Sequence, residues 1–214
     1  MNNIENNKIL YGIGGIVIGL ILAGVFYPMM RYSGFGMMNW RNNTISDQRV
    51  NGNAQVASTI DKHFIEQMIP HHEGAIAMAN LALKKATHPE IKTLATAIIA
   101  AQTAEIQSMN GWYQDWFGTS VPKVSTGMMS GGMMSQNGMH MGGQEDMTVL
   151  ENATDFDKAF IEEMIPHHQL AIMMANMLQS GTNQPEMQQL AKNIISSQSK
   201  EIQQMQAWYV QWYK

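Results

Sequence analysis

The sequence predicts an all-α protein, a four-helix bundle made of two helical hairpins and preceded by one hydrophobic helix. Three observations predict it: an internal repeat, helical spacing of apolar residues in each copy, and a charge-free stretch near the amino terminus. The chain has 214 residues and is 45% hydrophobic, which is enough for one core.

The amino-terminal stretch is the first element. Residues 9–30 carry no charge and lie between Lys8 and Arg31, a length that spans a bilayer. We expect a transmembrane anchor over 1–31, followed by a Met-containing juxtamembrane linker over 32–58. A cleaved signal peptide is the alternative, although the stretch exceeds a usual signal core and no A-x-A site follows it.

The internal repeat predicts the other four helices. A shift of 96 residues aligns 61–117 with 157–213 without a gap, and 29 of these 57 positions are identical. Each copy has two helical patterns separated by a short break, and Pro89 and Pro185 stand where a proline begins a helix. We therefore expect hairpins over 59–117 and 155–214.

The two hairpins are expected to share one core, because a single hairpin cannot bury its apolar stripe. Two separate small domains are the weaker alternative. The connection over 118–154 is rich in Gly, Ser and Met, and its length fits the long crossover of ferritin-like bundles.

Unusual polar residues lie on the predicted core faces. At 100° per residue, one face of the first helix carries the His71–His72 pair, and Glu66 points away from it. Pro70 and Pro166 are expected to bend or begin the helix just before each His pair. The predicted core faces comprise Phe64, Met68, His71, His72, Ala75, Met78 and Ala79; then Leu94, Ile98, Gln102, Glu105, Met109, Trp112 and Trp116; and, in copy two, Met164, His167, His168, Met174, Gln198, Glu201 and Met205.

These faces favour a metal site. A single core histidine is more often paired with a buried carboxylate, here His72 with Glu105. Four histidines, two glutamates and at least six methionines on facing stripes would be costly to bury without a ligand. The residues expected to orient the rings without binding the ion are Glu105, Glu201, Gln102 and Gln198.

The connecting segment offers soft ligands too. Residues 127–143 read "GMMSGGMMSQNGMHMGG", where glycine and serine cannot build a core. Thioether and imidazole without thiolate select Cu(I) or Ag(I), and they suit an oxidising extracytoplasmic compartment. A plain flexible linker is the alternative. The candidate ligands here are Met128, Met129, Met133, Met134, Met139, His140 and Met141.

Several other functions are disfavoured. The net charge of −4 and the pI near 5.9 argue against nucleic acid as the main partner. No G-x-S-x-G or P-loop motif is present. A carboxylate-bridged di-metal oxidase or peroxidase remains the runner-up, but it needs Glu-x-x-His motifs, and Met68 and Met164 stand where those glutamates would be.

The repeated motifs "M-I-P-H-H-x-x-A-I-x-M-A-N" and "Q-x-x-E-I-x-x-M-x-x-W" resemble a bacterial domain-of-unknown-function family of ferritin-like bundles with CopM-type periplasmic copper-binding members. The resemblance covers about 57 residues of each half. It implies a ligand set of Met68, His71, His72, Met78 and Met109, repeated as Met164, His167, His168, Met174 and Met205.

We therefore expect a membrane-anchored protein facing the periplasm or the extracellular side. We expect it to bind copper, with Cu(I) favoured and Ag(I) or Cu(II) also accepted, for tolerance, sequestration or delivery. Its partners are the metal ion, the membrane and an unidentified copper-transport protein or oxidase. No enzymatic activity is expected.

Overall fold

The computed structural model describes the backbone of residues 47–122 and 144–214, and the side chains of 59–122 and 147–214. The predicted anchor at 9–30 and the Met-rich residues 128–141 lie outside these ranges. No helix in the described part of the chain is long and apolar enough to cross a bilayer.

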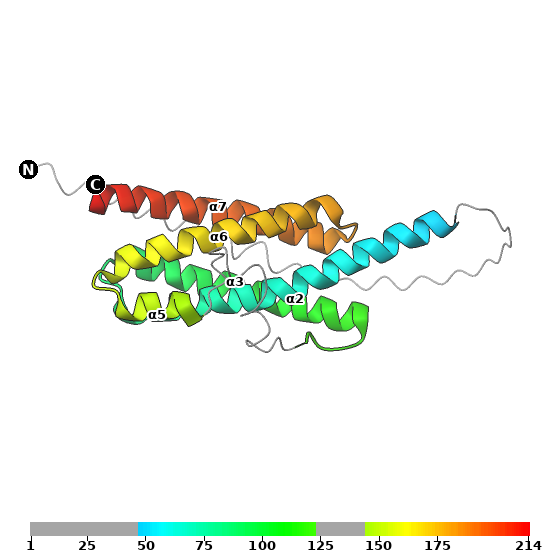
Figure 1. Ribbon diagram of the computed structural model, residues 1–214, viewed down its shortest axis with the longest axis horizontal. Coiled ribbons are helices and arrows are strands. Elements are labelled where there is room, and N and C mark those ends of the chain that lie inside the picture. Colours follow the sequence, from blue (N-terminus) through cyan, green and yellow to red (C-terminus); the bar gives the residue numbers. More distant parts are fainter. Residues whose placement is uncertain (1–46, 123–143) are drawn as a thin grey trace, which may run out of the picture. The chain divides into compact units, whose positions relative to one another are not determined.

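Helices alone make up the secondary structure of the described residues. The helices are α2 (Asp47–Lys85), α3 (Pro89–Phe117), α5 (Gln144–Asn152), α6 (Phe156–Gly181) and α7 (Pro185–Tyr213). Helices α2 and α3 form one hairpin, α6 and α7 form the other, and α2 packs against α6 (Figure 1). The predicted four-helix bundle is confirmed, and the alternative of two separate small domains is wrong.

Local sequence signals set the ends of the helices. Pro89 and Pro185 stand at the beginning of α3 and α7, as predicted, where a proline loses no intrahelical hydrogen bond. Asp155 caps α6 by accepting a hydrogen bond from the Lys158 backbone N–H. Helix α3 ends at Gly118, whose φ of 69° is a left-handed conformation that glycine adopts without a steric penalty.

Two boundaries differ from the sequence-based expectation. Helix α2 begins at Asp47, inside the predicted linker 32–58; no proline interrupts this stretch, so each added residue gains a helical hydrogen bond. Helix α5 lies inside the predicted crossover 118–154, where Leu150 is fully buried against the bundle. Pro70 and Pro166 are predicted either to bend or to begin the helix; they lie inside α2 and α6, which excludes the second alternative.

The bundle core consists of two apolar clusters. Cluster 1 joins the second half of α2 and the first half of α3 to α5, the first half of α6 and the second half of α7. Cluster 2 joins the opposite halves of the four long helices. Along each long helix, the polar residues of the His-Gln-Glu set lie between the two clusters. A polar layer therefore divides the core near its middle.

Candidate metal centre

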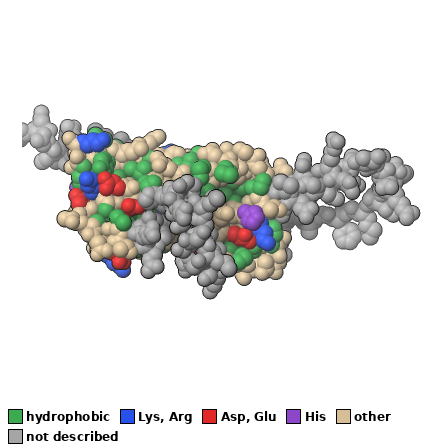
Figure 2. Space-filling model, in the orientation of Figure 1, with side chains coloured by type: hydrophobic (Ala, Val, Ile, Leu, Met, Phe, Trp, Pro, Cys, Tyr) green, Lys and Arg blue, Asp and Glu red, His purple; other side chains and the backbone are tan. Residues whose placement is uncertain are grey.

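All four predicted histidines lie in this polar layer. His71, His72, His167 and His168 are fully buried, and Gln102 and Gln198 are 3% exposed. The face in Figure 2 accordingly shows histidine in one small area only. We refer to these residues, together with Glu105 and Glu201, as the histidine layer.

The two repeats meet at the centre of this layer. The ring centroids of His71 on α2 and His167 on α6 are 3.7 Å apart, and the planes are inclined by 39°. Within each pair, the rings are 6.3 Å apart. The expected two sites, one in each repeat, are thus contiguous across the interface between α2 and α6.

The outer histidine of each pair contacts a glutamate of its own hairpin. His72 Nε2 lies 2.7 Å from Glu105 Oε2, and His168 Nε2 lies 2.6 Å from Glu201 Oε2. A carboxylate only accepts hydrogen bonds, so Nε2 of each ring is the donor, and in a neutral imidazole the lone pair then lies on Nδ1. This is how a carboxylate orients a metal-binding imidazole.

Several buried atoms of the layer have no hydrogen-bond partner of good geometry. They are both ring nitrogens of His71, Nδ1 of His72 and of His168, and Oε1 of Gln102 and of Gln198. An unsatisfied buried polar atom typically costs about 1–3 kcal/mol. Such a layer in the middle of an apolar core is therefore poorly explained by packing alone.

Burial also determines the charge of the central ring. Desolvation lowers the pKa of His71 to about 3; the nearby His72 and His168 add to the shift, and the His167 backbone opposes it. His71 is therefore neutral at pH 7, which is the form that binds a metal ion.

The predicted methionines fall into two groups. Because His72 pairs with Glu105, the antiparallel register sets Met68 level with Met109, and both are fully buried in cluster 2. Met164 and Met205 take the equivalent places in cluster 1. One thioether pair therefore flanks the histidine layer on each side.

The other two predicted methionines, Met78 and Met174, do not join the methionine pair of their own repeat. Met78 is ten residues from Met68, about 15 Å along the helix axis, and it lies in the opposite cluster. These two sulfur atoms cannot bind one ion together. Met174 is only partly buried, unlike its counterpart Met78.

The structure corrects the prediction that Glu66 points away from the core face of its helix. It accepts a 2.6 Å hydrogen bond from the hydroxyl of Tyr113, which is fully buried on α3. Glu162 and Tyr209 repeat this contact at 2.7 Å in the second hairpin. In the internal repeat, Glu66 aligns with Glu162 and Tyr113 aligns with Tyr209. This identity is the sequence signal that could have predicted the contact.

The sequence-based predictions also missed a group of contacts around Asp157 at one end of the bundle. Buried Asp157 accepts hydrogen bonds from the backbone N–H groups of Thr87 and His88 and contacts His88 Nδ1 at 2.6 Å. The His88 ring stacks on Trp212 at 3.8 Å. Burial acts to raise the pKa of Asp157, but hydrogen bonds from Thr87 and His88 outweigh it and hold this pKa below its ordinary value.

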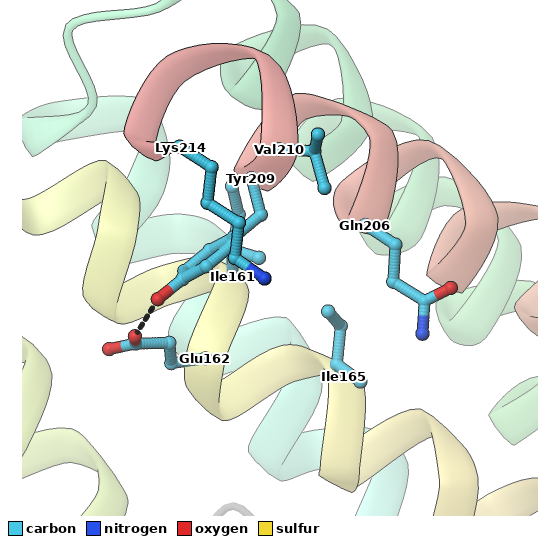
Figure 3. Close-up of a pocket in the computed structure, with 7 residues that line it drawn as sticks. All are labelled: Ile161, Glu162, Ile165, Gln206, Tyr209, Val210 and Lys214. Atoms are coloured by element: carbon cyan, nitrogen blue, oxygen red, sulfur yellow. Dashed lines mark hydrogen bonds between the residues drawn. The ribbon is translucent and has the colours of Figure 1, made fainter.

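The surface hollow in Figure 3 is separate from the histidine layer. It measures about 470 Å³ between α6 and α7 and is lined by Ile161, Glu162, Ile165, Gln206, Tyr209, Val210 and Lys214. Its lining offers no imidazole or thioether. Among the described residues, no three His, Asp or Glu side chains form a group able to hold a metal ion by themselves, so a metal site in the bundle would also need thioether ligands.

The fold and its polar layer define a class: an all-helical bundle of two related hairpins that buries imidazole, carboxylate and thioether groups at its centre. The chain belongs to the family described as "Domain of unknown function (DUF305)", whose model matches residues 61–209. The predicted family resemblance is confirmed.

Solved structures of CopM share this architecture. The Cu(I)-bound form of CopM is 47% identical, with a TM-score of 0.62 over 72% of this chain and 98% of that one. The form described as Ag-bound by soaking is 46% identical, with a TM-score of 0.61 over 72% and 97% of the two chains. A putative secreted DUF305 protein from Streptomyces coelicolor is 25% identical, with a TM-score of 0.60 over 71% and 93%.

A curated relative matches a shorter part of the chain. The uncharacterized protein L153 of Acanthamoeba polyphaga mimivirus is 46% identical over 50 residues, which are 23% of this chain. The match spans about a third of that relative, 33% of its length.

Proposed function

We propose that this protein binds copper, with Cu(I) favoured, in the histidine layer of the bundle. His71 and His167 would supply imidazole nitrogens from the centre. His72 and His168 would supply Nδ1, the atom left available by their contacts with glutamate. The methionine pairs on either side would add thioether ligands.

The observation that carries this proposal is the set of buried nitrogen atoms without a hydrogen bond of good geometry, namely both ring nitrogens of His71 and Nδ1 of His72 and of His168. A metal ion would satisfy lone pairs that the fold leaves without a hydrogen bond. Neutral imidazole and thioether are ligands suited to Cu(I) and Ag(I). The similar bundle of CopM has been solved in Cu(I)-bound, Cu(II)-bound and Ag-bound forms, which supports copper as the ion.

The donor set favours copper over a carboxylate-bridged metal pair. The two carboxylates of the layer, Glu105 and Glu201, each contact a histidine. A di-iron site in a bundle uses four carboxylates with two histidines. We therefore propose metal binding rather than oxidase or peroxidase catalysis.

The biological setting forms part of the proposal. Residues 9–30 would anchor the bundle on the extracytoplasmic side, and the Met-rich residues 128–141 would capture metal for it. Copper tolerance, sequestration and delivery are each consistent with such a protein.

Anaerobic titration with Cu(I) and with Fe(II), followed by metal analysis of the desalted protein, tests the central proposal. We expect Cu(I) to bind tightly, and substitution of Met68 and Met164 by leucine to weaken it. Tighter retention of Fe(II) than Cu(I), with no effect of the methionine substitutions, would overturn the proposal in favour of a di-metal site.

A further inference from the structure

Three methionines lie close together in the second half of α6. Residues 173–177 read "MMANM". Met173 is 45% exposed and Met177 is 68% exposed, while Met174 is partly buried against cluster 2. Exposed thioethers on a helix that is otherwise well packed are not required by the core.

The first repeat lacks this feature. Ala77 and Leu81 are the counterparts of Met173 and Met177, and Met78 is the counterpart of Met174. Leu81 packs against cluster 1, which includes Leu150 of α5. Among the described residues, the exposed methionine side chains are thus specific to the second hairpin, where Met173 and Met177 remain open to solvent.

The spacing brings the three side chains together. Residues three and four apart on a helix are neighbours, with Cβ atoms about 5–6 Å from each other. Met177 is therefore adjacent to both Met173 and Met174. Methionine has three rotatable side-chain bonds, so the thioethers can turn toward a common ion.

This group is distinct from the histidine layer. Met173 is six residues beyond His167, about 9 Å along the helix axis, and Met177 is about 15 Å beyond it. The exposure of Met173 and Met177 also contrasts with the full burial of His167. One ion cannot use both Met177 and the central imidazoles.

We propose that Met173, Met174 and Met177 form a second metal site, a surface thioether site for a soft monovalent ion such as Cu(I) or Ag(I). Thioether sulfur is a neutral, soft donor that prefers such ions to Zn²⁺, Mg²⁺ or Ca²⁺. The site is reached directly from solvent, whereas the histidine layer is enclosed by the bundle. It does not depend on metal binding by the layer.

The test uses the full chain labelled with [methyl-¹³C]methionine and titrated with Ag(I) in chloride-free buffer. Single Met→Leu variants assign the three methyl signals. The signals of Met173, Met174 and Met177 should shift together along one binding curve. In the Met173→Leu/Met177→Leu variant, the Met174 response should be lost and one fewer Ag(I) should bind per chain.

Two control variants make the outcome specific. Met187→Leu, which changes a fully buried methionine on α7, should leave the Ag(I) count and the three signals unchanged. His71→Ala/His167→Ala should leave the concerted shift intact even though it alters the layer, which separates this inference from the proposed function. Independent midpoints for the three methyl signals, or an undiminished Ag(I) count in the double variant, would refute the surface site.

Discussion

The imidazole rings of His71 and His167 lie 3.7 Å apart at the centre of the bundle, although the residues are 96 positions apart in the chain. This contact joins two repeats that the sequence presents as separate units. Metal binding by one repeat should therefore depend on the other.

The first prediction concerns this dependence. In a chain lacking residues 124–143, His71→Ala alone should weaken Cu(I) binding at the whole layer, because it removes a shared central ring. Anaerobic competition with a Cu(I) chelator measures the affinity. His63→Ala is the matched control, since the His63 side chain is 66% exposed. Two independent sites, one of them unaffected by the substitution, would contradict the shared layer.

The second prediction concerns the glutamates that contact His72 and His168. Glu105→Gln should reduce Cu(I) affinity about ten- to a hundredfold, as expected for a group that orients a metal ligand. Glu66→Gln is a suitable control, because Glu66 contacts Tyr113 instead of the layer. Equal effects of the two substitutions, measured by chelator competition, would argue against an orienting role for Glu105.

The third prediction concerns the Met-rich segment. Deletion of residues 124–143 should lower the number of Cu(I) ions bound and leave the bundle folded, because the deletion removes none of the described helices. Shortening a loop changes closure entropy by well under a few kcal/mol. Metal analysis and thermal unfolding measure the two effects. A sharp fall in the unfolding temperature would show that this segment contributes to the core.

The fourth prediction compares two equivalent aspartates. Asp157→Asn should reduce the free energy of unfolding by at least about 1.5 kcal/mol, because Asp157 accepts several hydrogen bonds as a charged group. Its counterpart Asp61 is buried, and neither of its carboxylate oxygens has a partner of good geometry. Burial raises the pKa of Asp61, and the Thr182 side chain offsets this only in part. Asp61→Asn should therefore leave stability unchanged or slightly higher in urea denaturation at pH 7.

The Asp157 effect should also depend on pH. Hydrogen bonds hold the folded-state pKa of Asp157 below 3.8, so its contribution is complete above that pH and is lost as the pH falls through the folded-state value. The unfolding free energies of the wild type and Asp157→Asn should converge as the pH falls below 3.8. A constant difference down to the lowest accessible pH would contradict this assignment.

The fifth prediction concerns location. If residues 9–30 anchor an extracytoplasmic bundle, protease added to intact spheroplasts should digest the part of the chain after residue 31. A cytoplasmic marker protein should survive the same treatment. Full protection of the bundle would contradict the proposed location.

The sequence alone determined much of this protein. The repeat predicted two hairpins, Pro89 and Pro185 predicted two helix starts, and helical spacing predicted the buried face that carries His71 and His72. These features were accessible because helix periodicity, proline geometry and the burial of apolar residues are local properties of the chain.

Only the tertiary structure decided how the predicted side chains combine. Antiparallel register set Met68 level with Met109, and the packing of α2 against α6 brought His71 to His167. Packing also exposed Met177, whereas its counterpart Leu81 is packed against cluster 1. The physical reason is that the burial of a side chain depends on which distant segment covers it, and the local sequence of a hairpin does not specify that segment.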